Sequence, residues 1–141
     1  MEILARAVLE GHILNLFDGF SRMPVEPKEI RLTGGLSRSE VWCQTISDVF
    51  ESEVVPVEGE GAALGAAIHA AWVWLKEERQ AVPLEELTFL FVVLDEKQRK
   101  KPVPGSVKVH QIQKKLFHRL SEGIRTGKNN DPFVLRHILA G

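Results

Sequence analysis

Apolar residues recur every three to four positions through the first twenty residues of the chain, with charged residues between them. This spacing gathers them on one side of a helix, so residues 2 to about 22 are predicted to be helical with one buried face. Pro24 and Pro27 should end that helix. The same period returns between Val107 and Ile124, which predicts a second amphipathic helix there.

Between these two helices the pattern changes from strand to helix and back. Glu29–Thr33 alternates charged and apolar residues before a glycine pair, which predicts a short strand. Ser37 and Glu40 have the spacing of a capping box, which predicts that a helix starts at Ser37. A second strand is predicted around Val54–Val57. The buried stripe of the intervening helix would consist of Val41, Trp42, Thr45, Ile46, Val49 and Phe50.

Strand, helix and strand in this order predict a parallel pair, and hence an α/β fold with a short, partly parallel sheet and packed helices. The alanine-rich run AALGAAIHAAWVWL, residues 62–75, should be a helix pressed closely against a sheet or another helix, because small residues permit close approach. The apolar run Thr88–Asp95 is ambiguous between buried helix and strand, and a helix that turns extended is favoured.

Composition excludes several classes of protein. The chain has 141 residues, of which 44% are hydrophobic and 26% charged, as in one soluble globular domain. Its net charge of -1 gives no general attraction to nucleic acid or to anionic lipid. The one concentrated basic segment is interpreted as a solvated surface; it contains Lys97, Arg99, Lys100 and Lys101.

Cys43 is the only cysteine, which excludes an intrachain disulfide and a cysteine-based zinc site. Together with an amino terminus unlike a signal peptide and no apolar run of membrane-spanning length, this predicts a cytoplasmic protein. The five histidines are scattered over different predicted elements with no pairing typical of a metal site.

Gly34 and Gly35 are the candidate functional residues, because they lie between a predicted strand and a predicted helix. Glycine lets the backbone approach a ligand closely, and the amino terminus of a helix attracts anions. On spacing alone, a simple strand-to-helix turn is the favoured interpretation. No Walker phosphate-binding loop is present in the sequence.

The run RLTGGLSRSEVWCQTISDVFESEVVPVEGEGAALGAAIHAA, residues 31–71, resembles the nucleotide-side signature of the FGGY family of carbohydrate kinases. In that signature Gly-Gly, Trp, Gln and Asp-Val precede a Pro-Val strand and an Ala-Leu-Gly-Ala-Ala helix. ARAVLEGHILNLFDGF is similar to the family's Arg-Ala-x-x-Glu-Gly helix, and a looser similarity continues to about Ile124. Within the family, the match leans toward xylulokinases and related pentulose kinases.

The resemblance implies an actin-like pair of ribonuclease-H-like domains with ATP and magnesium in the cleft between them. Residues 1–125 would be the carboxy-terminal part of the second domain, and residues 126–141 a tail of uncertain structure. Gly34 and Gly35 would lie against the phosphates and sugar of the nucleotide. Ser39 would lie near the adenine, at a position often occupied by asparagine.

The resemblance also implies that the catalytic parts lie elsewhere. No residues match the family's Asp-x-Gly-Thr phosphate loop, sugar pocket or catalytic aspartate, so no catalytic or metal-binding residue is assigned and Asp48 is not taken as a general base. The chain is expected to be inactive alone, with the sugar bound by preceding segments. The alternative is a non-catalytic interaction or regulatory module that keeps the kinase scaffold.

Four further expectations concern single elements. Trp42 is expected in the core, Gln44 toward solvent, and Glu60 at the positive end of the following helix. The resemblance also implies that the strand Glu29–Thr33 lacks its usual neighbour. An exposed strand edge recruits other chains, so a homo-oligomer is expected.

Overall fold

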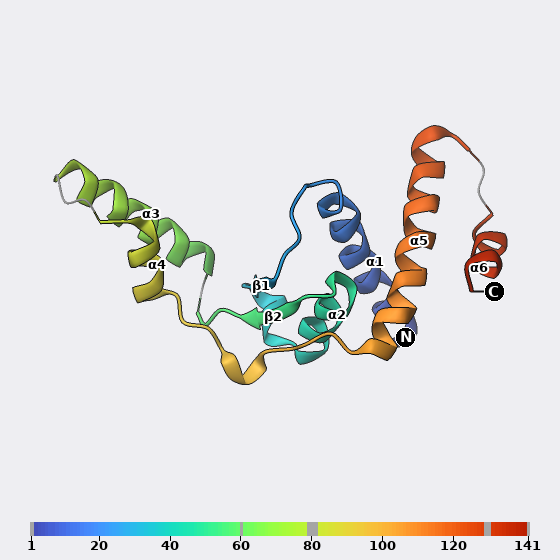
Figure 1. Ribbon diagram of the computed structural model, residues 1–141, viewed down its shortest axis with the longest axis horizontal. Coiled ribbons are helices and arrows are strands. Elements are labelled where there is room, and N and C mark those ends of the chain that lie inside the picture. The colour runs from blue at the N-terminus through green and yellow to red at the C-terminus, as the bar shows by residue number, and fades with distance from the viewer. Residues whose placement is uncertain (1, 60, 79–81, 129–130, 141) are drawn as a thin grey trace.

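The structure is a computed structural model that describes residues 2–59, 61–78, 82–128 and 131–140. Figure 1 shows an elongated molecule with a helical hairpin at one end and two helices at the other. Its elements are α1 (Glu2–Phe20), β1 (Glu29–Leu32), the 3-10 helix η1 (Gly35–Arg38), α2 (Glu40–Phe50), β2 (Glu53–Pro56), α3 (Gly61–Glu77), α4 (Leu84–Phe91), the 3-10 helix η2 (Glu96–Gln98), α5 (Pro104–Thr126) and α6 (Pro132–Ala140).

The two strands form a parallel sheet, as the sequence pattern predicted. Ile30 is in register with Val54, and Leu32 with Pro56. Helix α2 connects the strands, which confirms the predicted βαβ unit. The mixed helical architecture with a short parallel sheet confirms the predicted α/β class.

The far side of β2 is covered by the segment after α4, residues 93–103, which we call the strap. Val54 and Lys100 exchange backbone hydrogen bonds of 3.0 and 2.8 Å, and Val57 is bridged to Leu94. The chain therefore becomes extended after α4 ends at Phe91, as expected for the ambiguous apolar run. Among the described residues, β1 pairs only with β2, so its other edge has no strand beside it.

The core lies between α1, α2 and the sheet. Cys43, Val49 and Val54 are fully buried, and Ile13 and Leu14 of α1 pack against them. Burial also raises the pKa of the Cys43 thiol, since a thiolate would be desolvated there. Trp42 is half-buried against this cluster, which confirms its predicted core role. Val41 is 69% exposed, so the predicted stripe of α2 was wrong at that position.

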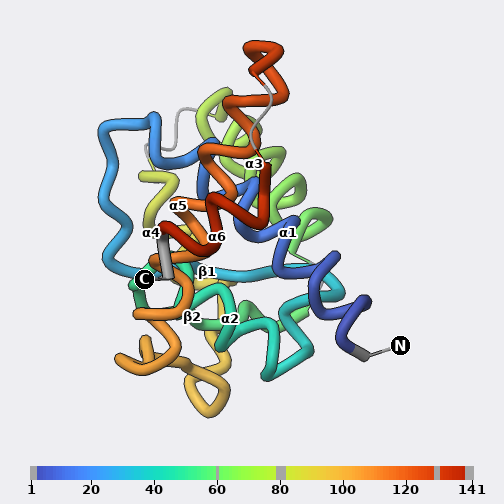
Figure 2. The backbone as a smooth tube through the Cα atoms, turned by 90° about the vertical axis from the view of Figure 1, so that its right-hand side faces the viewer, coloured from blue at the N-terminus to red at the C-terminus, as the bar shows by residue number. Residues whose placement is uncertain are grey.

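Lys114 of α5 joins three helices. Its ammonium group donates to the carbonyl of Val49 at 2.8 Å, pairs with Glu51 at 2.8 Å and lies 4.3 Å from the centre of the Phe17 ring. The cation thus meets the negative end of α2, a favourable position for positive charge. Helix α5 extends beyond the predicted residues 107–124 at both ends, and α6 packs against it, as Figure 2 shows.

The predicted capping box is not formed. The Ser37 hydroxyl donates to the carbonyl of Gly34 at 2.7 Å, and residues 35–38 form a 3-10 turn instead of the first turn of α2. Helix α2 begins at Glu40 after Ser39, whose side chain makes no capping hydrogen bond. The Glu40 carboxylate instead pairs with Lys100 at 2.9 Å. Lys100 of the strap therefore binds Glu40, the residue that the sequence pattern assigned to the capping box.

Helices α1 and α3 form where predicted, but their apolar faces are only partly covered. In α1, Ile3 and Leu4 are exposed although both belong to the predicted buried face. In α3, Ile68 is buried while Gly65 and the alanines around it are exposed. Helix α3 packs chiefly against α4, away from the sheet, and Figure 1 shows this hairpin apart from α2 and α5. The predicted close packing of its small residues was therefore wrong for this chain.

The accessible surface is large for the mass. It amounts to 10406 Å² for 15.8 kDa, whereas a compact monomer of that mass exposes about 7,300 Å². Much of the excess is apolar, on α1, on the hairpin and on α6. None of the described helices is long and apolar enough to cross a membrane.

Candidate functional site

The loop after β1 has a conformation that only glycine adopts readily. Gly34 has φ +88° and ψ -169°, and an added Cβ would meet no neighbour within 4 Å. The requirement at Gly34 is therefore one of backbone conformation, and open space lies beside it. Gly34 and Gly35 are both exposed. This combination leaves room for a ligand against the backbone of the loop.

A second glycine segment meets this loop. A Cβ on Gly61, the first residue of α3, would collide with the side chain of Thr33. The loop after β1 and the amino end of α3 are therefore in direct contact. Both follow the carboxyl ends of parallel strands, where open α/β sheets bind ligands. Glu60, expected at the positive end of α3, lies outside the described residues.

Ser39, the third predicted site residue, follows the same loop. It is half-buried and precedes α2, and its carbonyl accepts the Cys43 amide at 3.0 Å. The amides of Ser37 and Ser39 donate to the carbonyls of Gly34 and Leu36 at 3.2 and 3.1 Å. These two amides are thus already bonded within the turn and are not available to an anion. Gly34, Gly35 and Ser39 do bound one short turn, with Leu36 exposed between them.

Gln44 and Asp48 fasten the strap to α2. The Gln44 amide group donates to Asp48 Oδ1 and to the carbonyl of Lys101, both at 2.9 Å. Asp48 Oδ1 also accepts the Val103 amide at 2.7 Å, and Asp48 is buried. The expectation that Gln44 faces solvent was wrong. Its four-residue spacing from Asp48 was a sequence signal for this pair, whereas the strap contact had none.

Arg99 joins the amino ends of both strands. Its guanidinium donates to Glu29 at 2.8 Å and to Glu53 at 3.1 Å, and these glutamates are direct register partners in the sheet. Like charges opposite each other repel, and Arg99 offsets that repulsion. Hydrogen bonds from Arg99 and Arg31 hold the pKa of Glu29 below its usual range. Arg99 also pairs with Glu96 at 2.6 Å.

The basic segment is therefore more than a solvated surface. Side chains of Arg99 and Lys100 are each only 21% exposed, and both are ion-paired. Lys101 is 73% exposed but pairs with Glu53 at 3.1 Å. The interpretation as a solvated surface was wrong for Arg99 and Lys100, which are held by Glu29, Glu53 and Glu40 on other elements, and it is confirmed for the largely exposed Lys101.

Two histidines contact polar side chains. His110 is buried and contacts Gln113 at 2.6 Å, and His118 pairs with Asp18 at 2.6 Å. Hydrogen bonding to His118 lowers the pKa of Asp18. Within the part of the chain that the structure describes, no group of three or more His, Cys, Asp or Glu side chains could hold a metal ion.

Comparisons with known proteins identify the family of this chain. Residues 1–74 match the model of the FGGY family of carbohydrate kinases, C-terminal domain. A xylulose kinase from Haemophilus influenzae is 40% identical over 114 residues, which are 78% of this chain and 22% of that protein. A gluconokinase from Bacillus subtilis is 35% identical over 127 residues, 85% of this chain and 23% of that protein.

A solved structure also aligns with this chain. A ligand-bound xylulose kinase from Lactobacillus acidophilus aligns with a TM-score of 0.71 and 26% identity, covering 86% of this chain and 24% of that one. The chain thus spans under a quarter of the length of these relatives. The alignment confirms the actin-like ATPase fold expected from the resemblance.

Proposed function

Because the chain belongs to the FGGY family of carbohydrate kinases, we propose that it forms part of the adenosine-facing wall of an ATP-dependent, xylulokinase-like sugar kinase. The observation that carries the proposal is the contact between the Gly34–Gly35 loop and the amino end of α3. This contact puts an exposed glycine turn at the carboxyl edge of the sheet, where nucleotides bind in α/β proteins. Gly34 and Gly35 would lie along the phosphates and sugar, and Ser39 toward the adenine.

The proposal gives the chain no phosphoryl transfer of its own. That reaction needs magnesium on the phosphates and a group that receives the proton of the sugar hydroxyl. Asp48 is not suited to accept it, because its Oδ1 accepts hydrogen bonds from Gln44 and Val103. We assign the magnesium site, the base and the sugar pocket to the parts of the kinase outside the family's matched segment. The setting we propose is the cytoplasm.

A nucleotide titration tests the site. With ADP added to the ¹⁵N-labelled chain, we expect amide shifts at Gly34, Gly35 and Ser39, with Ile124 of α5 as an unmoved reference. Gly35→Leu puts a large side chain where the nucleotide would lie and should abolish these shifts, while Ile124→Ala should leave them unchanged. A folded chain whose loop amides stay unmoved at saturating ADP would contradict the site.

An activity measurement tests the proposal that the chain has no phosphoryl transfer of its own. With ATP, magnesium and xylulose, the chain should release no sugar-dependent ADP above a no-enzyme control. Sustained, sugar-dependent release of ADP by a preparation free of other kinases would contradict the proposal that this chain does not catalyse phosphoryl transfer by itself.

A non-catalytic interaction module is the second candidate. It is favoured by the large exposed apolar surface, which suits partner binding. The two candidates differ in the titration, because a pure interaction module has no reason to bind ADP at the glycine loop.

A further inference from the structure

Gly34 adopts a conformation that the residue itself does not fix. Its φ of +88° and ψ of -169° lie in a region almost reserved for glycine. Glycine occupies positive and negative φ about equally readily, so other conformations are open to it. A Cβ at Gly34 would meet no neighbour within 4 Å, so packing around it does not select the conformation either. That selection is left to hydrogen bonds.

Ser37 supplies these hydrogen bonds. Its hydroxyl donates to the Gly34 carbonyl at 2.7 Å, and its backbone amide donates to the same oxygen at 3.2 Å. Two donors from one residue fix the direction of this carbonyl. A trans peptide group is planar, with its N–H opposite to its C=O. The Gly35 amide therefore points away from Ser37 and out of the turn.

Ser37 is in turn fastened to α2. The Cys43 thiol donates to the Ser37 carbonyl at 3.4 Å, and the Cys43 amide donates to the Ser39 carbonyl at 3.0 Å. Cys43 is fully buried, and burial raises the pKa of its thiol, which keeps the proton for this bond. Ser37 is only 6% exposed. It thus acts from inside the turn and has almost no surface to offer a ligand.

We propose that Ser37 is a positioning residue of the nucleotide site: its hydroxyl holds the Gly34–Gly35 peptide with the Gly35 amide facing the bound nucleotide, without touching the nucleotide itself. This inference rests on the nucleotide site proposed above. A loop that is already held in its binding conformation loses less conformational entropy when the ligand binds. Affinity rises with the fraction of molecules in that conformation, so Ser37 sets the ADP affinity of the loop.

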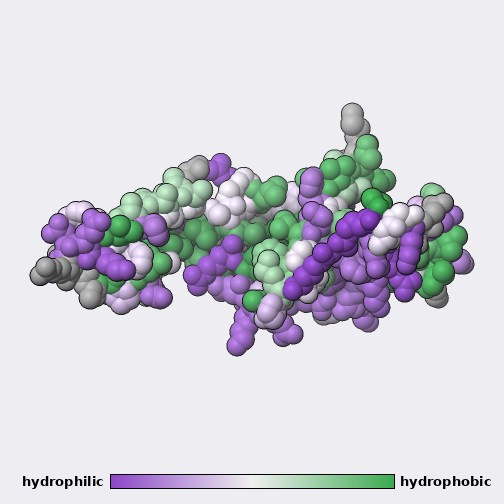
Figure 3. All heavy atoms as spheres, turned by 90° about the horizontal axis from the view of Figure 1, so that it is seen from above, coloured by the Kyte–Doolittle hydropathy of each residue, from purple (hydrophilic) through white to green (hydrophobic). Residues whose placement is uncertain are grey.

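The contacts that carry this role are internal to the chain. Ser37 bonds to a residue three positions before it and accepts from one six positions after it. Seen from above, Figure 3 shows hydrophobic residues gathered along the middle of the molecule, a surface suited to contact with other polypeptide segments. The hydrogen bonds of Ser37 do not depend on what covers that surface. The role can therefore be tested on this chain.

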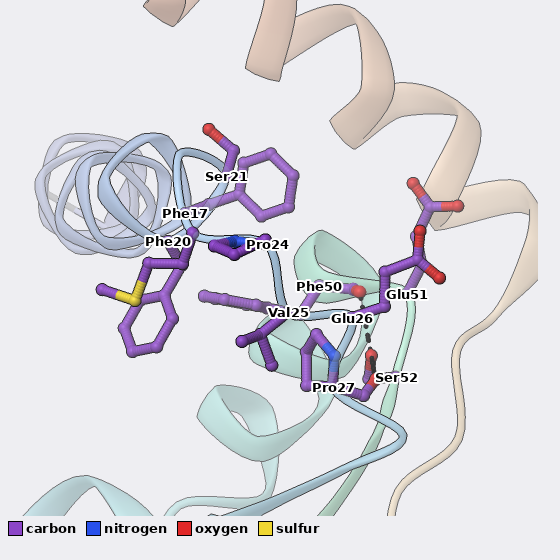
Figure 4. Close-up of a pocket in the computed structure, with 11 residues that line it drawn as sticks. Phe17, Phe20, Ser21, Pro24, Val25, Glu26, Pro27, Phe50, Glu51 and Ser52 are labelled. Atoms are coloured by element: carbon purple, nitrogen blue, oxygen red, sulfur yellow. Dashed lines mark hydrogen bonds between the residues drawn. The ribbon is translucent and has the colours of Figure 1, made fainter.

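A second buried serine supplies a matched control. Ser52 is also 6% exposed, and its hydroxyl donates to the Pro27 carbonyl at 2.7 Å, with that of Phe50 at 3.0 Å. Figure 4 shows Ser52 beside Pro27, in the pocket at the end of α1. Ser52 precedes β2, whereas the glycine loop follows β1, so in a parallel sheet the two lie at opposite ends. Ser52 thus matches Ser37 in burial and bond length but not in place.

ADP binding to three forms of the chain tests the role. Ser37→Ala removes one oxygen and adds nothing, so the fold should persist. We expect Ser37→Ala to bind ADP about three- to tenfold more weakly than wild type, the effect of losing one hydrogen bond that selects the loop conformation. Ser52→Ala should bind ADP as the wild type does. Calorimetric titration gives the Kd values, and urea denaturation should show similar losses of stability in both variants.

A measurement without nucleotide tests the same role independently. In ¹⁵N relaxation of the ADP-free chain, the Gly34 and Gly35 amides should become more mobile in Ser37→Ala and stay unchanged in Ser52→Ala. The amide of Ile124 on α5 serves as the reference in all three forms.

The possible outcomes separate this inference from the site on which it rests. Equal ADP affinity in wild type and Ser37→Ala overturns the role of Ser37 and leaves the nucleotide site standing. Equal weakening in Ser37→Ala and Ser52→Ala also overturns it, because a general loss of stability then accounts for the effect. A wild-type chain that does not bind ADP contradicts the nucleotide site, and the role of Ser37 with it.

Discussion

The strap and the α3–α4 hairpin are consecutive in the chain, yet they differ in how much of each finds a partner within it. The strap exchanges backbone hydrogen bonds with β2, and its side chains form ion pairs with β1, β2 and α2. The hairpin packs chiefly on itself and leaves Trp74 and Phe89 exposed. The strap therefore pairs many of its polar groups with the sheet and α2, whereas the hairpin leaves apolar side chains uncovered. The exposed apolar surface of the hairpin is suited to binding a partner, whereas the contacts of the strap stabilise the fold.

The largest expected effect is at Asp48, which ties the strap to α2. Asp48→Ala leaves the Val103 amide without its acceptor and removes the Gln44 bond, so it should lower the free energy of unfolding by about 3 kcal/mol. Asp48→Asn keeps an oxygen in place and should cost about half as much. Urea denaturation measures both. Equal losses would mean that charge, and not the hydrogen bonds to the strap, carries the effect.

The next largest effect is expected at Gly34, in the loop that contacts the amino end of α3. Gly34→Ala forces a side chain into a backbone region reserved for glycine, at a cost of about 1 to 3 kcal/mol. Gly35→Ala is the matched control, since Gly35 does not have a positive φ and a Cβ there meets nothing, and it should stay within about 0.5 kcal/mol. Thermal unfolding compares them. Two indistinguishable variants would contradict the conformation of the loop.

A smaller effect is expected at Arg99, and it should depend on pH. Hydrogen bonds from Arg99 keep the pKa values of Glu96 and Glu29 low in the folded state, while the pKa of Glu53 is lowered chiefly by Lys101 and to a smaller extent by Arg99. The resulting stability is present above a glutamate's ordinary pKa of about 4.3 and is lost as the pH falls through the lowered values. Arg99→Ala should thus be less stable than wild type at pH 7. Denaturation curves at stepwise lower pH should converge, and a gap that persists in acid would refute the ion-pair origin.

The smallest effect should be found on the hairpin. Ala67 is exposed on α3, so Ala67→Gln should change the free energy of unfolding by no more than about 0.5 kcal/mol. Ile68→Ala, at a buried position of the same helix, is the positive control and should cost more. Were Ala67→Gln to destabilise the chain by more than 1 to 2 kcal/mol, as overpacking does, the alanine face would be packed in solution.

Local patterns were sufficient to predict the elements with a clear period. Helices α1 and α5 and the β1–α2–β2 unit follow from apolar spacing, and the glycines marked the loop at the sheet's carboxyl edge. The capping box failed because Ser37 and Glu40 each have a closer partner, the Gly34 carbonyl and Lys100. Gln44 and the basic segment were misjudged because their partners lie 46 to 70 residues away. Such long-range contacts leave no periodic signal in sequence.

The hairpin also begins and ends at one place. The Glu58 amide donates to the Val93 carbonyl at 2.9 Å, so the chain that leaves β2 for α3 returns beside β2 after α4. Because β2 and the strap run antiparallel there, a tight turn can join them directly. Closing a shorter loop costs less chain entropy, and the change grows only slowly with length. The sheet and its strap therefore hold both ends of the hairpin together, and the amino end of α3, which the family model still matches, is kept beside the glycine loop.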